Sequence, residues 1–172
     1  MTPHEARAAV NVIGTQLQHE WMTTVKVLEA IPEANKDWKP EEKGRSAWDL
    51  AVHLAGADIW FLDSILAGGF SSDPEGENKL KAAAPTPAKL AAWYKHEFPK
   101  KLEQVLALPD VKFTEIIDFY GMKNPAIVYL NFCLVHGVHH RGQLSAYLRP
   151  MGGKVPAIYG GSADEPFPGA PA

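Results

Sequence analysis

Apolar residues recur at alternating spacings of three and four over residues 6–28 of this chain. This spacing follows the period of the α-helix, so it places a continuous apolar stripe on one helix face. Thr2, Pro3 and Glu5 match the N-cap, N1 and N3 positions of a capping box, and an Ile-Pro step at residues 31–32 ends the pattern. The chain therefore opens with a long amphipathic helix, which needs other apolar faces to cover its stripe.

Two further helices are predicted with comparable start and stop signals. The first covers residues 46–68, with a serine as N-cap, Asp49 placed to complete a capping box, and two glycines as the stop. The second covers residues 86–109, with Thr86 as N-cap and a proline at N1. Pro99 lies inside this helix, where it removes a backbone donor and should produce a kink.

A fourth helix is predicted to run to residue 149, with Asn124 as N-cap and Pro125 at N1. Residues 111–120 are rich in β-branched and aromatic types and look extended, but one short segment does not establish a sheet. We interpret them as part of a crossover. Residues 71–85 are polar and are predicted to form a loop.

Four helices that each carry one apolar stripe, with two long connections among them, predict an all-α four-helix bundle with a long crossover. The Gly- and Pro-rich tail, residues 152–172, should be irregular. A length of 172 residues with 46% hydrophobic content suits a single domain that spans residues 1–172.

Charge and hydropathy exclude several classes of partner. The net charge is -3, and no run of Lys or Arg forms a stripe that could follow a nucleic acid backbone. The longest apolar run, AIVYLNFCLV, is shorter than the ~20 residues that span a bilayer, and MTPHEARAAVNVIG lacks the pattern of a signal peptide. We therefore expect a cytoplasmic protein without nucleic acid or membrane partners. Cys133 is the only cysteine, so no internal disulfide can form.

Three histidines are the strongest indication of function. His136 and His140 are four residues apart in the fourth predicted helix, so their imidazoles lie on one face, one turn apart. His53 lies in the apolar pattern of the second helix and could complete a three-histidine site for a divalent metal ion. The alternative is that all three are core histidines satisfied by hydrogen bonds. Two histidines in register with a third on a facing helix favour the metal site.

Several neighbours of these histidines have other expected roles. His139 lies near the edge of the stripe, so we favour an interface or supporting role for it over ligation. Cys133 should be a small buried residue rather than a reactive thiol. Gly137 and Gly142 in a helix interior suggest that another helix approaches closely, from this subunit or a second one.

Other polar and aromatic side chains are less clearly placed. Glu20, Asp49 and Asp58 are the helix-borne carboxylates that could act as a general base, although Asp49 already has a capping role. His4, His19 and His96 should lie on the surface, and Trp48, Trp60 and Trp93 should fill the core.

Three segments resemble the DinB family, within the DinB/YfiT-like metalloenzyme superfamily: HLAGADIWFL around His53, VHGVHHRGQLSAYLRPMG around His136 and His140, and KVPAIYGGSADE near the C-terminus. The resemblance extends over nearly the whole chain. It implies a four-helix bundle with up-down-down-up topology, usually a homodimer, with one divalent metal bound by three histidines. Those ligands correspond to His53, His136 and His140.

The resemblance also implies a range of activities. Characterised relatives are thiol-dependent enzymes, such as a mycothiol-dependent maleylpyruvate isomerase and S-transferases that use bacillithiol or mycothiol, while others are described as metal-dependent hydrolases. We therefore expect a metal-dependent enzyme that acts on a small molecule, namely a thiol-dependent S-transferase with a low-molecular-weight thiol cosubstrate and Zn or Ni as the bound ion. The alternatives are a metal-dependent hydrolase and a noncatalytic, stress-related protein that binds a metal or small molecule.

The C-terminal tail has two possible roles. Its apolar residues should pack on the bundle rather than extend into solvent. It could then reach the metal site and present Tyr159 or Asp164 to a substrate, or it could cover exposed core at the end of the bundle.

Overall fold

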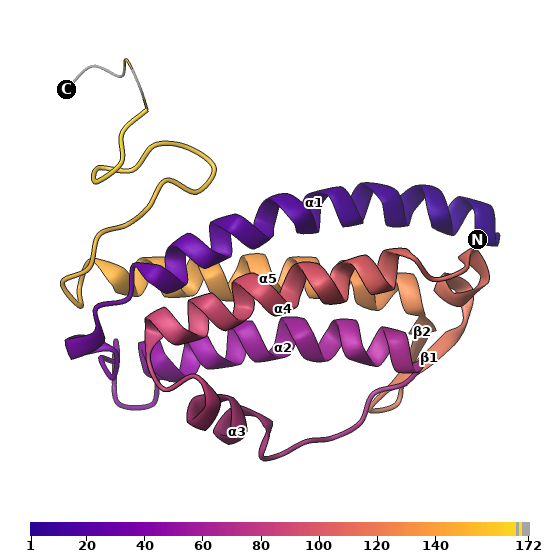
Figure 1. The fold of residues 1–172 in the computed structure, drawn as a ribbon, viewed down its shortest axis with the longest axis horizontal. Coiled ribbons are helices and arrows are strands. Elements are labelled where there is room, and N and C mark those ends of the chain that lie inside the picture. The colour runs from indigo at the N-terminus through magenta and orange to yellow at the C-terminus, as the bar shows by residue number, and fades with distance from the viewer. Residues whose placement is uncertain (168, 170–172) are drawn as a thin grey trace.

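The computed structural model describes residues 1–167 and 169, and four long helices make up most of it (Figure 1). These are α1 (Pro3–Glu29), α2 (Ala47–Ala67), α4 (Pro87–Leu106) and α5 (Ala126–Leu148). Helices α1 and α2 each pack against both α4 and α5, so the four form a bundle with one shared core. The predicted all-α bundle is confirmed.

The direction of each helix in the bundle follows from its connections. Figure 1 shows α1 and α5 running in one direction and α2 and α4 in the opposite one. The segment between α2 and α4 returns along the length of the bundle, so these two helices run parallel. This order of directions is the one that the family resemblance implies.

Each predicted N-cap side chain of the first three long helices accepts a backbone hydrogen bond, but the second predicted capping box is incomplete because the Asp49 carboxylate binds the Ser46 hydroxyl rather than the Ser46 amide. Thr2 and Glu5 form a complete capping box at the start of α1. At the start of α2 the Ser46 hydroxyl accepts from the Asp49 amide at 3.0 Å and donates to the Asp49 carboxylate at 2.8 Å. At the start of α4 the Thr86 hydroxyl accepts a hydrogen bond from the amide of Lys89. The sequence pattern therefore located the first three long helices to within a few residues.

One prediction for the connections is wrong. Residues 71–85, predicted to be a loop, contain helix α3 (Gly76–Ala83), which packs on α2 through the buried side chain of Leu80. Eight residues with one buried side chain give no apolar period that a sequence pattern could reveal. A helix this short is stabilised by its packing rather than by intrinsic propensity.

The crossover between α4 and α5 contains more structure than predicted. After a 3-10 turn (Asp110–Thr114), strands β1 (Ile116–Phe119) and β2 (Met122–Pro125) pair as an antiparallel hairpin, with Phe119 opposite Met122. Asn124 pairs with Ile117 in this hairpin, so it is not the N-cap of α5, and that prediction is wrong. Pro125 holds the cap position without a side-chain hydrogen bond, and α5 begins one residue later.

Helix α2 is long and largely apolar. Within the described part of the chain, it is the one helix long and apolar enough to cross a membrane. Most of its residues are buried against the other bundle helices. The core helix of a soluble bundle has this same character, so we interpret α2 as a core helix.

Candidate metal centre

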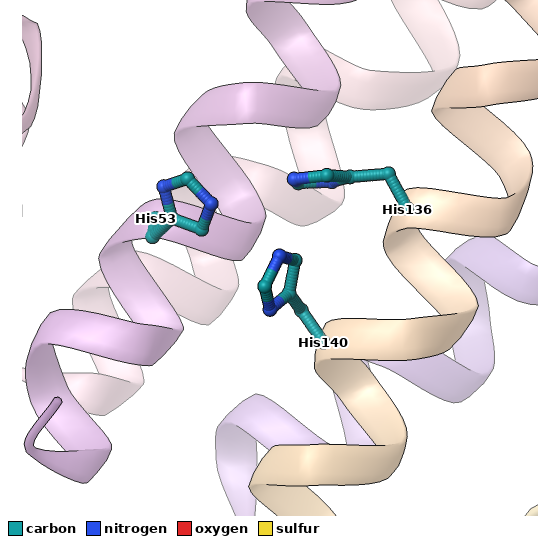
Figure 2. A group of neighbouring side chains, drawn as sticks. All are labelled: His53, His136 and His140. Atoms are coloured by element: carbon teal, nitrogen blue, oxygen red, sulfur yellow. The ribbon is translucent and has the colours of Figure 1, made fainter. Parts of the chain in front are cut away.

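Three histidines from two neighbouring helices converge in the structure (Figure 2). His53 projects from α2, and His136 and His140 project from successive turns of α5. One ligand nitrogen from each lies within 4.8 Å of the other two. Ring centroids are 4.4 Å apart for His136 and His140 and 4.8 Å apart for His53 and His140. The structure therefore brings together the three residues that the sequence predicted as ligands.

The backbone arrangement explains why these helices can approach so closely. Gly137 lies between the two histidines of α5, and a Cβ atom there would meet both carboxylate oxygens of Asp58 on α2 at 3.3 Å. The absence of a side chain at this position leaves room for the Asp58 carboxylate against α5. The close approach that Gly137 predicted thus occurs within the subunit, whereas Gly142 is exposed with open space around it.

An oxygen atom faces the Nδ1 atom of each histidine. His53 Nδ1 lies 2.9 Å from Glu77 Oε1, and His140 Nδ1 lies 3.0 Å from Gln143 Oε1. His136 Nδ1 faces Asp58 Oδ1 at 3.8 Å. An acceptor at Nδ1 favours the tautomer that carries its proton there, which leaves Nε2 unprotonated and available to a metal ion. Three such nitrogens fit a divalent ion such as Zn or Ni.

Asp58 is a buried carboxyl beside the histidines, with 3% of its surface exposed. Burial raises the pKa of this carboxyl, while the nearby His136 imidazole and the hydrogen bond from Tyr94 act in the opposite direction. Its Oδ2 accepts a hydrogen bond from the Tyr94 hydroxyl at 2.8 Å. Its Oδ1 and the His136 Nδ1 are both buried without a hydrogen-bond partner, and they face each other. Asp58 is therefore placed to orient His136.

Two of the histidines are held in the neutral form that a metal ion requires. Desolvation lowers the pKa of His140 from 6.5 to about 4, and the nearby imidazoles add to this effect. Desolvation also lowers the pKa of His53, although the hydrogen bond to Glu77 opposes the shift. At neutral pH, therefore, little energy is needed to deprotonate these two ligands before an ion binds.

Glu77 links α3 to this group. Partial burial acts to raise the pKa of its carboxyl, but the hydrogen bond to His53 and the charge of Arg45 outweigh burial, so the pKa is lowered. Arg45 Nη1 lies 3.2 Å from Glu77 Oε1. The Oε1 atom of this carboxylate is thus shared between a cation and a histidine.

A cavity of about 720 Å³ adjoins the histidines. His53 and His136 form part of its wall, and the hairpin contributes Phe119 and Tyr120 on another side. Further aromatic residues of α2, α4 and α5 complete a largely apolar lining: Trp60, Phe61, Trp93 and Phe132. The prediction that Trp60 and Trp93 simply fill the core is therefore incomplete, while Trp48 is buried as predicted.

Other candidates from the sequence lie outside the histidine group. His139 is exposed, and its ring packs against that of His140 with centroids 4.8 Å apart. Asp49 is engaged by Lys81 at 2.6 Å. Glu20 forms an ion pair with Arg141 and accepts a hydrogen bond from the Tyr159 hydroxyl at 3.0 Å. The cavity lining does not include His139, Asp49 or Glu20.

The tail packs on α1 and α5 rather than over the cavity. Tyr159 contacts Arg141, and Asp164 binds Arg149 and the backbone amide of Val155. Val155 and Ile158 pack against the bundle core. These contacts support the second of the two roles considered, in which the tail covers the core of the bundle. Neither Tyr159 nor Asp164 lines the cavity.

The sequence analysis assigned no role to two residues that form hydrogen bonds with the histidines. Glu77 lies in the segment predicted to be a loop, so its approach to His53 depends on the path of α3. Gln143 falls on the same helical stripe as His136 and His140, and its spacing of three from His140 was the available signal.

Comparisons with known proteins agree with this architecture. The sequence profile of the DinB family matches residues 11–167. A Bacillus subtilis protein called YjoA is 26% identical over 141 residues, which cover 82% of this chain and 89% of that protein. A second protein of that organism, YrdA, is 35% identical over 83 residues, which cover 47% of this chain and 50% of its own length.

Two solved structures share the fold. The crystal structure of the DinB-like protein YjoA from Bacillus subtilis superposes with a TM-score of 0.63 at 23% identity, covering 81% of this chain and 92% of that one. A DinB-like protein from Bacillus cereus gives a TM-score of 0.68 at 22% identity, with coverage of 83% and 92%. The profile match over most of the sequence, together with the shared fold, assigns the chain to a family: this protein belongs to the DinB family.

Proposed function

We propose that this protein is a metal-dependent enzyme that transfers a low-molecular-weight thiol to an electrophilic small molecule. The observation that carries the proposal is a group of three histidines beside a cavity of about 720 Å³. A divalent ion bound by three neutral imidazoles keeps its positive charge and an open position, and so lowers the pKa of a thiol or water that binds there.

The sulfur atom must come from a cosubstrate. Cys133 is buried, and its thiol lies 3.7 Å from the backbone oxygen of Asp58. Desolvation raises the pKa of Cys133 well above its ordinary value, and the charge of Asp58 adds to the effect. Because the thiolate is the reactive form, Cys133 is a poor nucleophile, as its predicted structural role implies.

Hydrolysis is the less favoured reaction because it needs a general base beside the attacking water. Asp58 is buried and holds Tyr94, while Glu77 is shared between His53 and Arg45. Neither carboxylate is free to accept a proton from water. A noncatalytic binding protein would instead close the coordination sphere, and in the described residues no fourth protein donor joins the three histidines.

In the proposed reaction, the thiol sulfur forms a bond to an electrophilic carbon of the substrate. The leaving group departs with the electron pair of the broken bond, and the thiol proton passes to solvent. Asp58, Glu77 and Gln143 orient the histidines, and the aromatic walls of the cavity keep water from the electrophile.

The test is a turnover screen with protein loaded separately with Zn, Ni and Mn. Each sample is incubated with cysteine, glutathione, bacillithiol or mycothiol and with 1-chloro-2,4-dinitrobenzene, and chloride release is measured. We expect metal-dependent release with at least one thiol, and none from a His136→Ala/His140→Ala variant. Ester hydrolysis by the loaded protein without any thiol-dependent release would replace this proposal with the hydrolase.

We further propose that the protein acts as a cytoplasmic homodimer. Val128, Val135 and Gly142 are exposed at heptad spacing along one face of α5, which supports packing against a second copy. Multi-angle light scattering at micromolar concentration should give twice the chain mass. A monomer under those conditions would contradict the dimer.

A further inference from the structure

The turn of the hairpin contains a residue in an unfavourable backbone conformation. Tyr120 has a φ of 50° and the following Gly121 has a φ of 90°. Positive φ at both central residues is the geometry of a type I′ turn, where Asn-Gly is the preferred pair. In the part of the chain that the structure describes, Tyr120 is the one residue other than glycine with positive φ. A tyrosine here therefore makes the turn less stable than asparagine would.

Packing does not explain the choice of tyrosine. The side chain of Tyr120 is 70% exposed, so it contributes little to the core. The hairpin is held by other groups: Ile117 is buried, and the Tyr129 hydroxyl donates a hydrogen bond to the backbone oxygen of Met122. A strained residue whose ring is not needed for folding points to a role in the site that it borders.

Tyr120 lies at one end of a chain of aromatic rings that leads to the histidines. Its ring packs edge-on against Phe119 with centroids 5.1 Å apart, and Phe119 lies 6.2 Å from Phe61. Phe61 in turn lies 5.5 Å from the His136 ring. All four residues line the cavity, and Trp60 packs beside Phe119 at 5.8 Å. One wall of the cavity is thus a continuous aromatic surface.

The charged groups of the cavity are already neutralised. Its three carboxylates each pair with a cation that lies outside the lining: Asp63 with Lys101 at 2.6 Å, Asp73 with Lys79 at 3.0 Å, and Glu77 with Arg45 at 3.2 Å. Lys and Arg are absent from the lining residues, all of which lie in the described region. Apart from an ion held by the histidines, the described lining side chains therefore offer a ligand their aromatic rings rather than an unpaired charge.

We propose that Tyr120 is a substrate-positioning residue and that the cavity accepts a neutral, planar aromatic group. Offset and edge-to-face contacts with the aromatic wall favour a flat ring over a saturated group of the same size. This inference rests on the proposed function to the extent that the aromatic group carries the electrophilic carbon. The left-handed turn directs a large ring toward the cavity at a cost in stability.

The test measures equilibrium binding of nitrobenzene to the metal-loaded full-length protein by titration calorimetry, in the absence of any thiol. We expect Tyr120→Asn to weaken binding about 5-fold through loss of one aromatic contact. The same variant should raise the midpoint of thermal unfolding by about 2 °C, because asparagine suits the left-handed turn. Tyr120→Phe should keep wild-type affinity. Met122→Thr, on the same hairpin but outside the lining, is the matched control and should also bind normally.

Three results would overturn the proposal. Unchanged nitrobenzene affinity in Tyr120→Asn would remove the positioning role. Equally tight binding of nitrocyclohexane would show an apolar cavity without preference for a flat ring. Tighter binding of 4-nitrobenzenesulfonate than of nitrobenzene would show recognition of an anion. Because binding is measured without turnover, absence of thiol transfer would refute the proposed function and leave this result standing.

Discussion

The Oε1 atom of Glu77 lies 2.9 Å from the Nδ1 atom of His53, which connects the shortest α-helix of the structure to a candidate metal ligand. Such a contact fixes the tautomer and the ring orientation of a ligating histidine. Arg45, which precedes α2, forms an ion pair with the same carboxylate. Two segments outside the four-helix core therefore determine the orientation of the His53 ring.

We first predict that Glu77→Ala lowers Zn affinity at least 10-fold, because outer carboxylates of histidine ligands typically contribute 10- to 100-fold. Glu77→Gln should show a smaller loss, since its amide oxygen can still accept the Nδ1 proton. Glu75→Gln, in the same segment but bonded to Asn78, is the control. Competition titration with a fluorescent chelator measures all three, and equal affinities for Glu77→Ala and the control would contradict the role of Glu77.

The second prediction concerns metal content. Purified wild-type protein should hold about one divalent ion per chain, and the His136→Ala/His140→Ala variant should hold essentially none. His139→Ala should keep the ion, because His139 is exposed and does not belong to the group of three. Atomic emission spectrometry on gel-filtered samples decides the matter, and wild-type metal content in the double variant would refute the site.

A third prediction follows from the lowered pKa of His140, which is about 4 in the folded protein against 6.5 ordinarily. Between these values the unfolded chain binds the proton and the folded chain does not. The contribution of His140 to apoprotein stability is therefore complete above pH 6.5 and is lost as the pH falls to about 4.

Urea unfolding of metal-free protein measures this effect. The wild type should lose more stability between pH 6.5 and 4 than a His140→Gln variant, which lacks the titrating group. Groups far from His140 titrate equally in both proteins, so the difference between their curves reports on His140 together with the imidazoles coupled to it. Parallel curves would show that its pKa is not lowered by folding.

Gly137 and Gly142 give a matched pair for the fourth prediction. Gly137→Ala places a Cβ at 3.3 Å from the Asp58 carboxylate, which is buried and held by Tyr94, so overpacking should outweigh the gain in helix propensity. We expect a net loss of about 1 kcal/mol. Gly142→Ala meets no atom within 4 Å and should add about 0.5 kcal/mol to the stability of the subunit. Chemical denaturation compares the two, and stabilisation by both changes would contradict the close approach.

The tail provides the fifth prediction. The Tyr159 hydroxyl bonds to Arg141, which is buried, and to Glu20. Tyr159→Phe should therefore destabilise the fold by about 1 kcal/mol, with Zn affinity unchanged because Tyr159 does not line the cavity. Truncation after Gly153 should likewise reduce stability and spare metal binding. Loss of metal binding with full stability would instead place the tail in the site.

The parts of the fold that could be predicted are those encoded by local chemistry. Caps such as Thr2 and Ser46 and the glycines after α2 define helix ends through hydrogen bonds within a few residues. The pair His136 and His140 is likewise a consequence of helix geometry alone. These features need no knowledge of the rest of the chain.

The parts that could not be predicted depend on packing between distant segments. Helix α3 is stabilised by the contact of Leu80 with α2. The sequence of β2, MKNP, has low strand propensity, so β2 forms only because it pairs with β1 in the hairpin. Glu77 and Tyr120 lie on these two elements, so their approach to the cavity was invisible to sequence patterns. Asp58 was recognised as a candidate carboxylate, but its burial against Gly137 follows only from the docking of α2 on α5.

The placement of the histidines on two different helices has a mechanical consequence. His53 and His136 are separated by about eighty residues of chain, so an ion that bridges them acts as a reversible cross-link that closes a very long loop. Binding energy is then also folding energy, because the unfolded chain cannot hold the ion in the same way. The resistance of the protein to heat and proteolysis would rise and fall with the supply of metal in its surroundings.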